Sequence, residues 1–228
     1  MTRKAPRRTA QRIQETALTL FNRFGEPNVS TTLLATELRI SPGNLYYHFP
    51  AKEALINRLH EDFEAALDTV LGQAAGVRDL PGAWRFVREL FELMARYRFL
   101  YRDMNDLLSN NHHLETRLRE ALARKEAAMA AMLSGLGAAG LLRLEASERD
   151  ILARSMVVLA TYWLNYEFVC NPRQALEPEA VREAIVRGTR HTLQVLAPYL
   201  GPAHHGALQQ LQQRAQVAEP VVEDALPT

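Results

Sequence analysis

The side chains best suited to metal or covalent chemistry in this chain are two pairs of neighbouring histidines and one cysteine. His112 and His113, and likewise His204 and His205, are adjacent, so on a helix they diverge by about 100° and cannot form the i, i+4 pair that grips zinc. Cys170 lies in an apolar stretch without an identifiable partner, which favours packing over nucleophilic chemistry. No glycine-rich phosphate loop, G-x-S-x-G motif or paired-carboxylate motif is present. The sequence therefore predicts no catalytic residue, no metal and no cofactor, in a protein that is not an enzyme.

A second set of side chains, near an expected helix N-terminus, suits contact with nucleic acid. Ser30 and Thr31 stand where a short helix begins, so their hydroxyls can cap that helix and can also donate to a phosphate. Thr32, one residue further along, is placed to touch a base. These residues predict a helix N-terminus that faces DNA.

The next short helix, expected at residues 42–49, carries more specific hydrogen-bonding chemistry. Ser41 is its N-cap candidate and is followed by a proline at the first helical position, where a missing N–H costs nothing. Gly43 is a poor helix former, so its place in the first turn suggests close approach to DNA. Asn44 can pair with adenine or bridge to a phosphate, and Tyr46 is placed to contact a base or a thymine methyl group.

The charge of the chain is divided unevenly. Residues 1–60 hold nine Lys or Arg and four Asp or Glu, whereas the other residues hold 18 basic and 22 acidic side chains. A basic front on an acidic body is expected when one end of a protein meets a polyanion. The basic side chains at the N-terminus can extend into a minor groove. This arm consists of Arg3, Lys4, Arg7 and Arg8.

Nearly every segment shows helical periodicity, and no alternating run of β-branched residues lies between turn signals, so the sequence predicts an all-α fold. No apolar run approaches the ~18 residues of a membrane span, and we expect a cytoplasmic protein without a membrane partner. Ser147, with Asp150 three residues on, is the expected cap of one long helix. The helices are expected at residues 9–24, 30–39, 42–49, 52–71, 81–98, 102–108, 113–136, 147–168 and 178–197, with a looser one at 208–214 and a disordered tail from 217.

Two short helices joined by a tight turn, after a packing helix and before a long one, form a helix-turn-helix arrangement. The stretch from Leu18 to Leu59 reads LTLFNRFGEPNVSTTLLATELRISPGNLYYHFPAKEALINRL. Through its LFNRFG, SPGNLYYHF and KEAL blocks it resembles the DNA-binding domain of the TetR family of transcriptional regulators. Arg39 departs from the pattern, because many members have glycine in this turn, and it is expected to stiffen or reshape the turn.

The resemblance implies roles for three further side chains. Tyr47 and His48 match the phosphate-binding positions of the family. Lys52, at the start of the next helix, matches a phosphate clamp, although a lysine there can also be a solvated surface residue. Within the family, residues 25–30 and 40–49 resemble the regulators of polyhydroxyalkanoate gene clusters.

A three-helix unit of this size contacts one half-site, so we expect a homodimer on a pseudo-palindromic stretch of double-stranded DNA. Residues 156–164 are apolar all round, which predicts cover by the core on one side and by a partner on the other. The resemblance likewise implies a dimer interface made from the last two long helices. The second of these is expected to contribute Ile185, Thr189, Thr192 and Val195 or Leu196.

The middle helices are expected to line a cavity for a small apolar effector. Apolar walls with a few hydroxyls are typical of small-molecule sites, although such stripes are also common in ordinary cores. The resemblance to the polyhydroxyalkanoate regulators suggests a fatty-acyl compound. The expected ligand-contacting residues are Phe91, Met94, Tyr97, Tyr101, Met104, Leu108, Tyr162 and Tyr166.

The sequence thus predicts an N-terminal three-helix helix-turn-helix domain at residues 1–52, a helical ligand-sensing and dimerisation domain at 53–200, and a loose helix with a tail at 201–228. We expect a repressor that leaves its operator when the effector favours a dimer whose two N-terminal domains no longer match the operator. The long helix from residue 52 is the expected lever. The alternative is a DNA-binding regulator whose body binds a protein or granule surface instead of a metabolite.

Overall fold

A computed structural model describes residues 6–217, with the side chains of residues 8–214. Within this range no strand is present, and an isolated antiparallel bridge joins Leu142 and Leu200. The predicted all-α fold is confirmed. No helix in the described range is long and apolar enough to cross a membrane. The predictions for Arg3, Lys4, the side chain of Arg7 and the tail from residue 218 lie outside the described residues.

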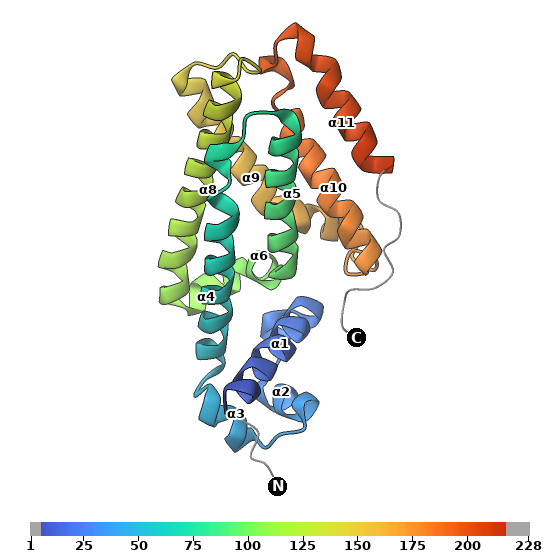
Figure 1. The fold of residues 1–228 in the computed structure, drawn as a ribbon. Helices are drawn as coiled ribbons and strands as arrows, with labels where there is room; N and C mark the ends of the chain where they lie inside the picture. Colours follow the sequence, from blue (N-terminus) through green and yellow to red (C-terminus); the bar gives the residue numbers. More distant parts are fainter. Residues whose placement is uncertain (1–5, 218–228) are drawn as a thin grey trace.

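The helices form two parts (Figure 1): an N-terminal unit of α1 to α3 at one end, and a body that begins with α4 and contains the rest. The helices are α1 Pro6–Phe24, α2 Thr31–Leu38, α3 Pro42–His48, α4 Lys52–Leu71, α5 Leu80–Arg96, α6 Phe99–Arg102, α7 Met104–Asn110, α8 His112–Ala138, α9 Ala146–Cys170, α10 Pro178–Gln194 and α11 His205–Val217. Short 3-10 turns lie at η1 Glu26–Asn28, η2 Ala74–Gly76, η3 Ala197–Tyr199 and η4 Pro202–His204.

The N-terminal unit is held together by a small apolar core. Helix α1 buries Ile13 and Phe21 on one face, as its helical spacing predicts. Leu34 from α2 and Leu45 from α3 complete this core. Gly25 ends α1 with a φ of 90°, a backbone conformation in which a Cβ would be strained.

The turn between α2 and α3 keeps a left-handed residue although it holds no glycine. Arg39 has φ 55° and ψ 44° and is the one non-glycine residue with positive φ among residues 6–217. The next amide, that of Ile40, donates to the carbonyl of Ala35, which closes the end of α2. The arginine itself takes up the left-handed conformation in which this hydrogen bond closes the helix. The expectation that Arg39 stiffens or reshapes the turn stays a prediction.

The body is a bundle in which α4, α5, α8, α9 and α10 surround one core (Figure 1). Helix α8 packs along α4 and α9, and α10 packs against α5 and α9. Helix α11 lies across α10 and α5 and buries Leu208. The looser helix that was expected at 208–214 is therefore a docked helix that begins at His205.

Two local predictions in the body are wrong. The single helix expected at residues 102–108 is divided into α6 and α7 at Asp103, whose carboxylate accepts a hydrogen bond from the backbone of Glu26 in the N-terminal unit. Helix α9 is capped by Glu145 instead of Ser147. Glu145 and Glu148 form a reciprocal capping box, which satisfies two amides at once and therefore sets the start of the helix two residues earlier.

Candidate nucleic-acid interface

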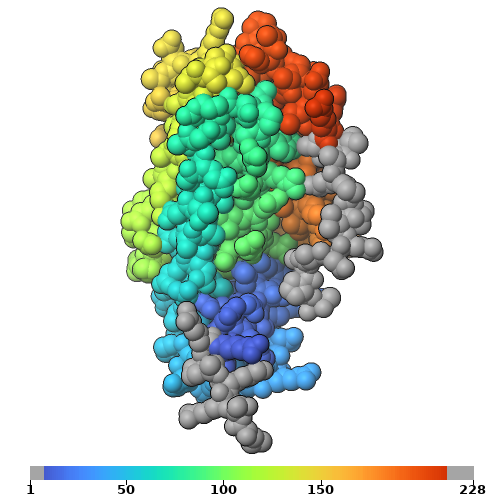
Figure 2. Space-filling model, viewed as in Figure 1, coloured from blue at the N-terminus to red at the C-terminus, as the bar shows by residue number. Residues whose placement is uncertain are grey.

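Helices α1 to α3 form one end of the molecule (Figure 2), and most residues of α3 are exposed there. Tyr47 is 77% exposed, and Gly43, Asn44 and Tyr46 are also exposed. Leu45, between them, is buried in the core of the N-terminal unit. These predicted DNA-contacting residues therefore share one outward face of α3, while the buried Leu45 holds the helix on the core. Entry of a helix into a major groove requires such a face.

A serine caps each of the two short helices: Ser41 as the sequence predicts, and Ser30 from the two candidates Ser30 and Thr31. Ser30 Oγ accepts a hydrogen bond from the amide of Leu33 at 3.1 Å, and Ser41 Oγ accepts one from the amide of Asn44 at 3.2 Å. A hydroxyl that accepts in a cap still carries its own proton as a donor. Capping and phosphate contact by Ser30 are therefore compatible in this geometry.

The structure brings two of the predicted contact residues together. Thr31 Oγ1 and Tyr46 Oη lie 3.0 Å apart and share a hydrogen bond between the start of α2 and the exposed face of α3. Thr32, the next residue of α2, is exposed at the same end of the molecule. The hydrogen bond links the Tyr46 side chain of α3 to the start of α2, and DNA contact by either residue stays a prediction.

Gly43 has open space where its side chain would be. A Cβ built there would meet Ser41 Oγ at 4.0 Å, which is ordinary contact. The protein itself therefore does not need a glycine in the first turn of α3. This geometry supports the prediction that the constraint on Gly43 comes from the close approach of DNA.

Lys52 forms an ion pair and a hydrogen bond with Glu26 of the same chain. Its Nζ lies 2.7 Å from Glu26 Oε1 and donates to the Glu26 carbonyl oxygen at 2.7 Å. The side chain is half-buried and spans from α4 back to η1. The structure thus supports neither a free phosphate clamp nor a solvated lysine, because the ammonium must first leave Glu26 before it can bind a phosphate.

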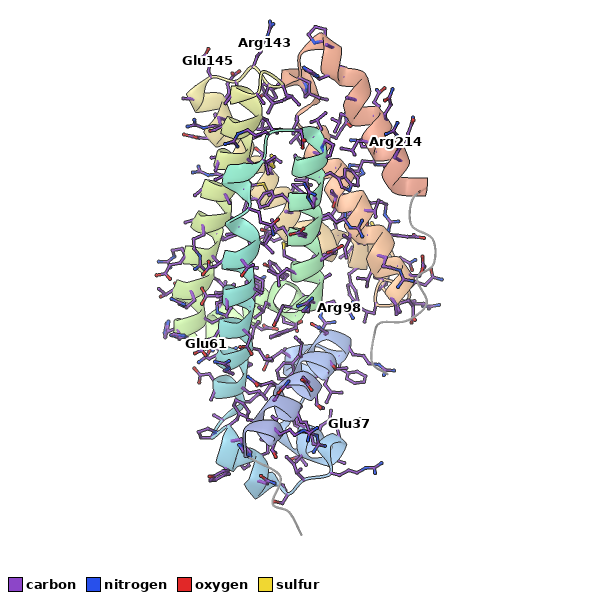
Figure 3. The ribbon with its side chains drawn as sticks, viewed as in Figure 1. Glu37, Glu61, Arg98, Arg143, Glu145 and Arg214 are labelled. Atoms are coloured by element: carbon purple, nitrogen blue, oxygen red, sulfur yellow. The ribbon has the colours of Figure 1, made fainter. Side chains whose placement is uncertain are left out.

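The N-terminal unit is attached to the body at the carboxyl end of α1. Arg102 of α6 donates through Nη2 to the Phe21 carbonyl at 2.8 Å, and Arg98 donates through Nε to the Asn22 carbonyl at 3.2 Å. Asn22 returns the contact by donating to the Arg96 carbonyl at 2.7 Å and accepting from the Phe99 amide. Figure 3 shows Arg98 at this border.

This set of contacts, the α1–α6 clasp, supplies donors to the Asn22 carbonyl in the last turn of α1. It also adds a second donor to the Phe21 carbonyl, which already accepts from the Gly25 amide. Burial, and then the nearby Arg102, lower the pKa of Arg98. The Phe21 ring of α1 also packs against the Phe99 ring of α6, with the ring centroids 5.3 Å apart. Because α6 belongs to the body and α1 to the N-terminal unit, a shift of α6 must move α1 or break these hydrogen bonds.

Family models match both parts of the chain. A model described as bacterial regulatory proteins, tetR family, matches residues 13–59, and one described as bacterial transcriptional repressor matches residues 62–208. The chain belongs to the TetR family. It is a DNA-binding transcriptional regulator with an N-terminal helix-turn-helix, and the face of α3 described above is its candidate DNA interface.

Solved structures of other regulators share this TetR-family fold. A TetR-family transcriptional regulator from Marinobacter aquaeolei VT8 is 27% identical with a TM-score of 0.82, covering 91% of this chain and 98% of the other. A transcriptional regulator from Saccharomonospora viridis, solved with choline, is 20% identical with a TM-score of 0.63, covering 82% and 96%. A γ-butyrolactone receptor (ArpA-like) is 15% identical with a TM-score of 0.65, covering 94% and 99%. No curated protein matches the sequence.

A buried polar cluster joins α4 to α8 in this TetR-family regulator. Glu64 accepts hydrogen bonds from Arg117 Nε at 2.8 Å and Arg124 Nη2 at 2.6 Å. His60 Nδ1 lies 3.6 Å from the same carboxylate, and among residues 6–217 its Nε2 has no hydrogen-bond partner. Burial lowers the pKa of His60 from 6.5 to about 4, against the opposing effect of Glu64 and with smaller lowering by Arg117, His113 and Arg124.

We expect this histidine to make the protein sensitive to mild acid. Its pKa in the folded state lies below the value of an unfolded histidine, so the unfolded chain binds the proton first and stability falls as the pH drops from 6.5 towards 4. Between about pH 7 and pH 5 the wild type should lose about 2 kcal/mol more than a His60→Gln variant. Urea unfolding at both pH values measures this difference, and equal losses in the two proteins would contradict it.

The predicted ligand residues divide into two groups. Phe91, Met94, Tyr97 and Tyr101 are buried in the body, and Met104 and Leu108 are partly buried against the same core. Tyr162 and Tyr166 are exposed on the outer side of α9. The first group faces the interior that was predicted for the ligand, whereas the two tyrosines of α9 face away from it.

A hollow of about 470 Å³ lies between the N-terminal unit and the body. The predicted ligand residues do not line it. Its lining comes from η1, the start of α4, and α7 and the residue after it: Glu26, Pro27, Lys52, Glu53, Ile56, Asp106, Leu107, Asn110 and Asn111. The buried side chains of the first group belong to the core cluster of the body instead.

Several residues of this architecture were not predicted. Asn22, Arg98 and Arg102 form the α1–α6 clasp, and His60 and Glu64 anchor α4 to α8. A buried position in a helix shows itself through apolar spacing, so polar residues that are buried by pairing across helices give no such signal. For His60 and Glu64 one sign was available: they directly follow Leu59 and Phe63, two members of an apolar repeat of four residues in α4, and so lie beside its buried face.

Proposed function

We propose that this TetR-family regulator is a repressor that binds a pseudo-palindromic operator as a twofold dimer and is released by a small apolar effector. The observation that carries the DNA part is the outward face of α3, where Gly43, Asn44, Tyr46, Tyr47 and His48 surround the buried Leu45. A helix that shows only polar and small groups outward, at the tip of the molecule, fits a major groove.

The proposed dimer forms through α9. Apolar side chains recur on its outer side every three to seven residues, with Val158 54% and Tyr162 58% exposed. Such a stripe on a long helix is more than scattered surface apolar residues, and it marks an interaction face. The stripe, which we call the α9 face, consists of Ile151, Val158, Tyr162, Tyr166 and Val169.

The residues predicted to bring α10 into the dimer interface lie mostly on its buried side. Ile185, Thr189, Thr192 and Leu196 are buried within the protomer, so they cannot meet a partner, whereas Val195, the alternative to Leu196, is only partly buried. Their spacing predicted one apolar face, and that face belongs to the core. The α10 side nearer to the α9 face carries His191, whose ring stacks on Trp163 with centroids 4.7 Å apart.

A Val158→Asp variant is expected to be monomeric and to bind operator DNA about a hundredfold more weakly than the wild type. A carboxylate in the centre of the α9 face would be buried without a partner in each half of the dimer, and each monomer would hold only one half-site. Sedimentation velocity measures the mass, and anisotropy of labelled DNA measures the affinity.

The matched control is Ala65→Asp, which places the same carboxylate on an exposed position of α4. This variant should remain dimeric and bind DNA as the wild type does. A Val158→Asp protein that sediments as a dimer would show that the interface lies elsewhere.

The effector is proposed to be a fatty-acyl compound that enters between the helices around Phe91, Met94, Tyr97 and Tyr101. Support comes from the apolar character of this interior and from the resemblance of residues 25–30 and 40–49 to the regulators of polyhydroxyalkanoate gene clusters. Solved relatives include a regulator in complex with choline and a γ-butyrolactone receptor, so this fold accommodates small molecules. The packed interior implies that the helices separate when the effector enters.

The test is fluorescence anisotropy with DNA from upstream of the protein's own coding sequence, with competitor DNA and a salt series. Tight binding that survives the competitor and weakens with salt supports the proposal. Equal affinity for the competitor would contradict an operator in that region. In a second step, acyl-CoAs of several lengths are titrated calorimetrically, and a lack of binding at every length would refute the fatty-acyl part.

A further inference from the structure

Lys125 of α8 is a buried basic side chain for which the proposed function gives no reason. It is 3% exposed, and its Nζ donates a hydrogen bond to Tyr101 Oη at 2.7 Å. The ammonium lies 4.7 Å from the centre of the Tyr101 ring and 6.0 Å from that of Phe63. None of the carboxylates in residues 8–214 forms an ion pair with it.

Burying the Lys125 ammonium without a counter-ion costs free energy. An ammonium group has three hydrogen-bond donors, and the Tyr101 hydroxyl takes one of them. Burial without a counter-ion lowers the pKa of Lys125 from 10.5 to about 7. A methionine would fill similar space without this cost. The lysine is therefore expected to have an acceptor that the protein itself does not supply.

The choice of lysine is itself unusual in this chain. Only three of its 27 basic residues are lysines, namely Lys4, Lys52 and Lys125, and the rest are arginines. An arginine stays charged in any protein environment, whereas a lysine can lose its proton when it is buried and regain it when an anion arrives. Lysine is thus the basic residue that suits a closed interior which opens for a negatively charged ligand.

We propose that Lys125 is the anchor for a carboxylate, and that the effector is a small organic acid with an apolar chain. The two oxygens of a carboxylate can accept N–H donors of the ammonium in place of the Tyr101 hydroxyl, and the apolar rings around the ammonium suit the chain that carries it. In this structure the Tyr101 hydroxyl occupies the place beside Nζ, so the acid must displace it. This inference rests on the proposed function for its effect on DNA, although binding of the acid is measured without DNA.

The position of Tyr101 connects this site to the DNA-binding end. Tyr101 belongs to α6, and the next residue, Arg102, holds the Phe21 carbonyl in the α1–α6 clasp. The Tyr101 carbonyl accepts a hydrogen bond from Asn165 Nδ2 of α9 at 3.0 Å. An acid that takes the place of the Tyr101 hydroxyl therefore displaces a side chain of α6, and α6 is the helix that is hydrogen-bonded both to α1 and to α9, the helix of the proposed dimer interface.

The experiment titrates butyrate, hexanoate, octanoate and decanoate into the full-length protein by calorimetry, each beside the primary alcohol of the same chain length. We expect at least one acid to bind about tenfold more tightly than its alcohol. In Lys125→Met this preference should disappear, while the variant still binds DNA. Met129→Leu, one turn further along α8 and equally buried, is the control and should keep the preference.

The fold of each variant is checked by thermal unfolding, and Lys125→Gln replaces Lys125→Met if the latter does not fold. The proposal is overturned if no acid binds the wild type, or if Lys125→Met or Lys125→Gln keeps the preference for acid over alcohol. Acid binding that depends on Lys125 in a protein without operator preference would leave this inference standing and refute the proposed function. Release of DNA by acyl-CoA without binding of any acid would refute this inference and leave the proposed function standing.

Discussion

Replacing Tyr47 and His48 together with alanine is expected to weaken operator binding by the dimer about a hundredfold. Each side chain is proposed to form a hydrogen bond with a phosphate, and the proposed twofold dimer would make each contact twice, so four contacts of about 0.7 kcal/mol account for the expected loss. The two rings lie edge to face with centroids 5.1 Å apart, and Tyr47 is largely exposed, so the fold should lose little stability. Anisotropy of labelled operator DNA measures the change.

A His112→Ala variant is the control for this experiment. His112 is exposed at the start of α8, outside the N-terminal unit, and its loss should leave DNA affinity unchanged. The double variant must also unfold at the same temperature as the wild type. Undiminished affinity in a folded Tyr47→Ala/His48→Ala protein would place the phosphate contacts on other residues.

Gly135→Ala is expected to lower the free energy of unfolding by about 3 kcal/mol. Gly135 lies inside α8 where this helix crosses η2, and a Cβ there would collide with the carbonyl oxygen of Val77 and with Arg78 Nη1. The arginine can move, but the carbonyl belongs to the backbone, so the whole crossing has to open. Urea unfolding followed by circular dichroism measures the loss.

Gly137→Ala, two residues further along the same helix, is the matched control. Its Cβ would meet the Leu142 carbonyl oxygen at 3.9 Å, which is an ordinary contact. Alanine is a better helix former than glycine, so this variant should gain up to about 0.5 kcal/mol. If Gly135→Ala proves as stable as Gly137→Ala, the close crossing of α8 and η2 is not needed for stability.

The sequence was informative about the candidate DNA interface, because the relevant signals are local. Ser30 and Ser41 cap the helices that their positions predict, and Leu45 is buried while Tyr47 is exposed. Caps depend on a side chain and an amide three residues away, and burial within a short helix follows its period. Arg39 was noticed in the sequence, but only the backbone shows that it keeps the left-handed turn.

The sequence was less informative about the faces of the body. The apolar run at 156–164 is buried on one side and exposed on the other, as predicted, but the direction of each side chain was open. Tyr162 lies on the exposed side and Thr189 on the buried side, which reverses the roles predicted for them. An apolar stripe looks the same whether it meets the protomer's own core or a partner.

What the sequence by itself determined is the all-helical fold, the helix-turn-helix and the Ser41 cap of α3, with the cap of α2 narrowed to Ser30 or Thr31, because these follow from hydrogen bonds and side-chain spacing within a few residues. Only the tertiary structure decided which distant polar groups meet. Lys52 is held by Glu26, Lys125 by Tyr101, and the end of α1 by Arg98. Such partners come from helices far apart in the chain, and whether a buried charge finds one depends on how those helices pack.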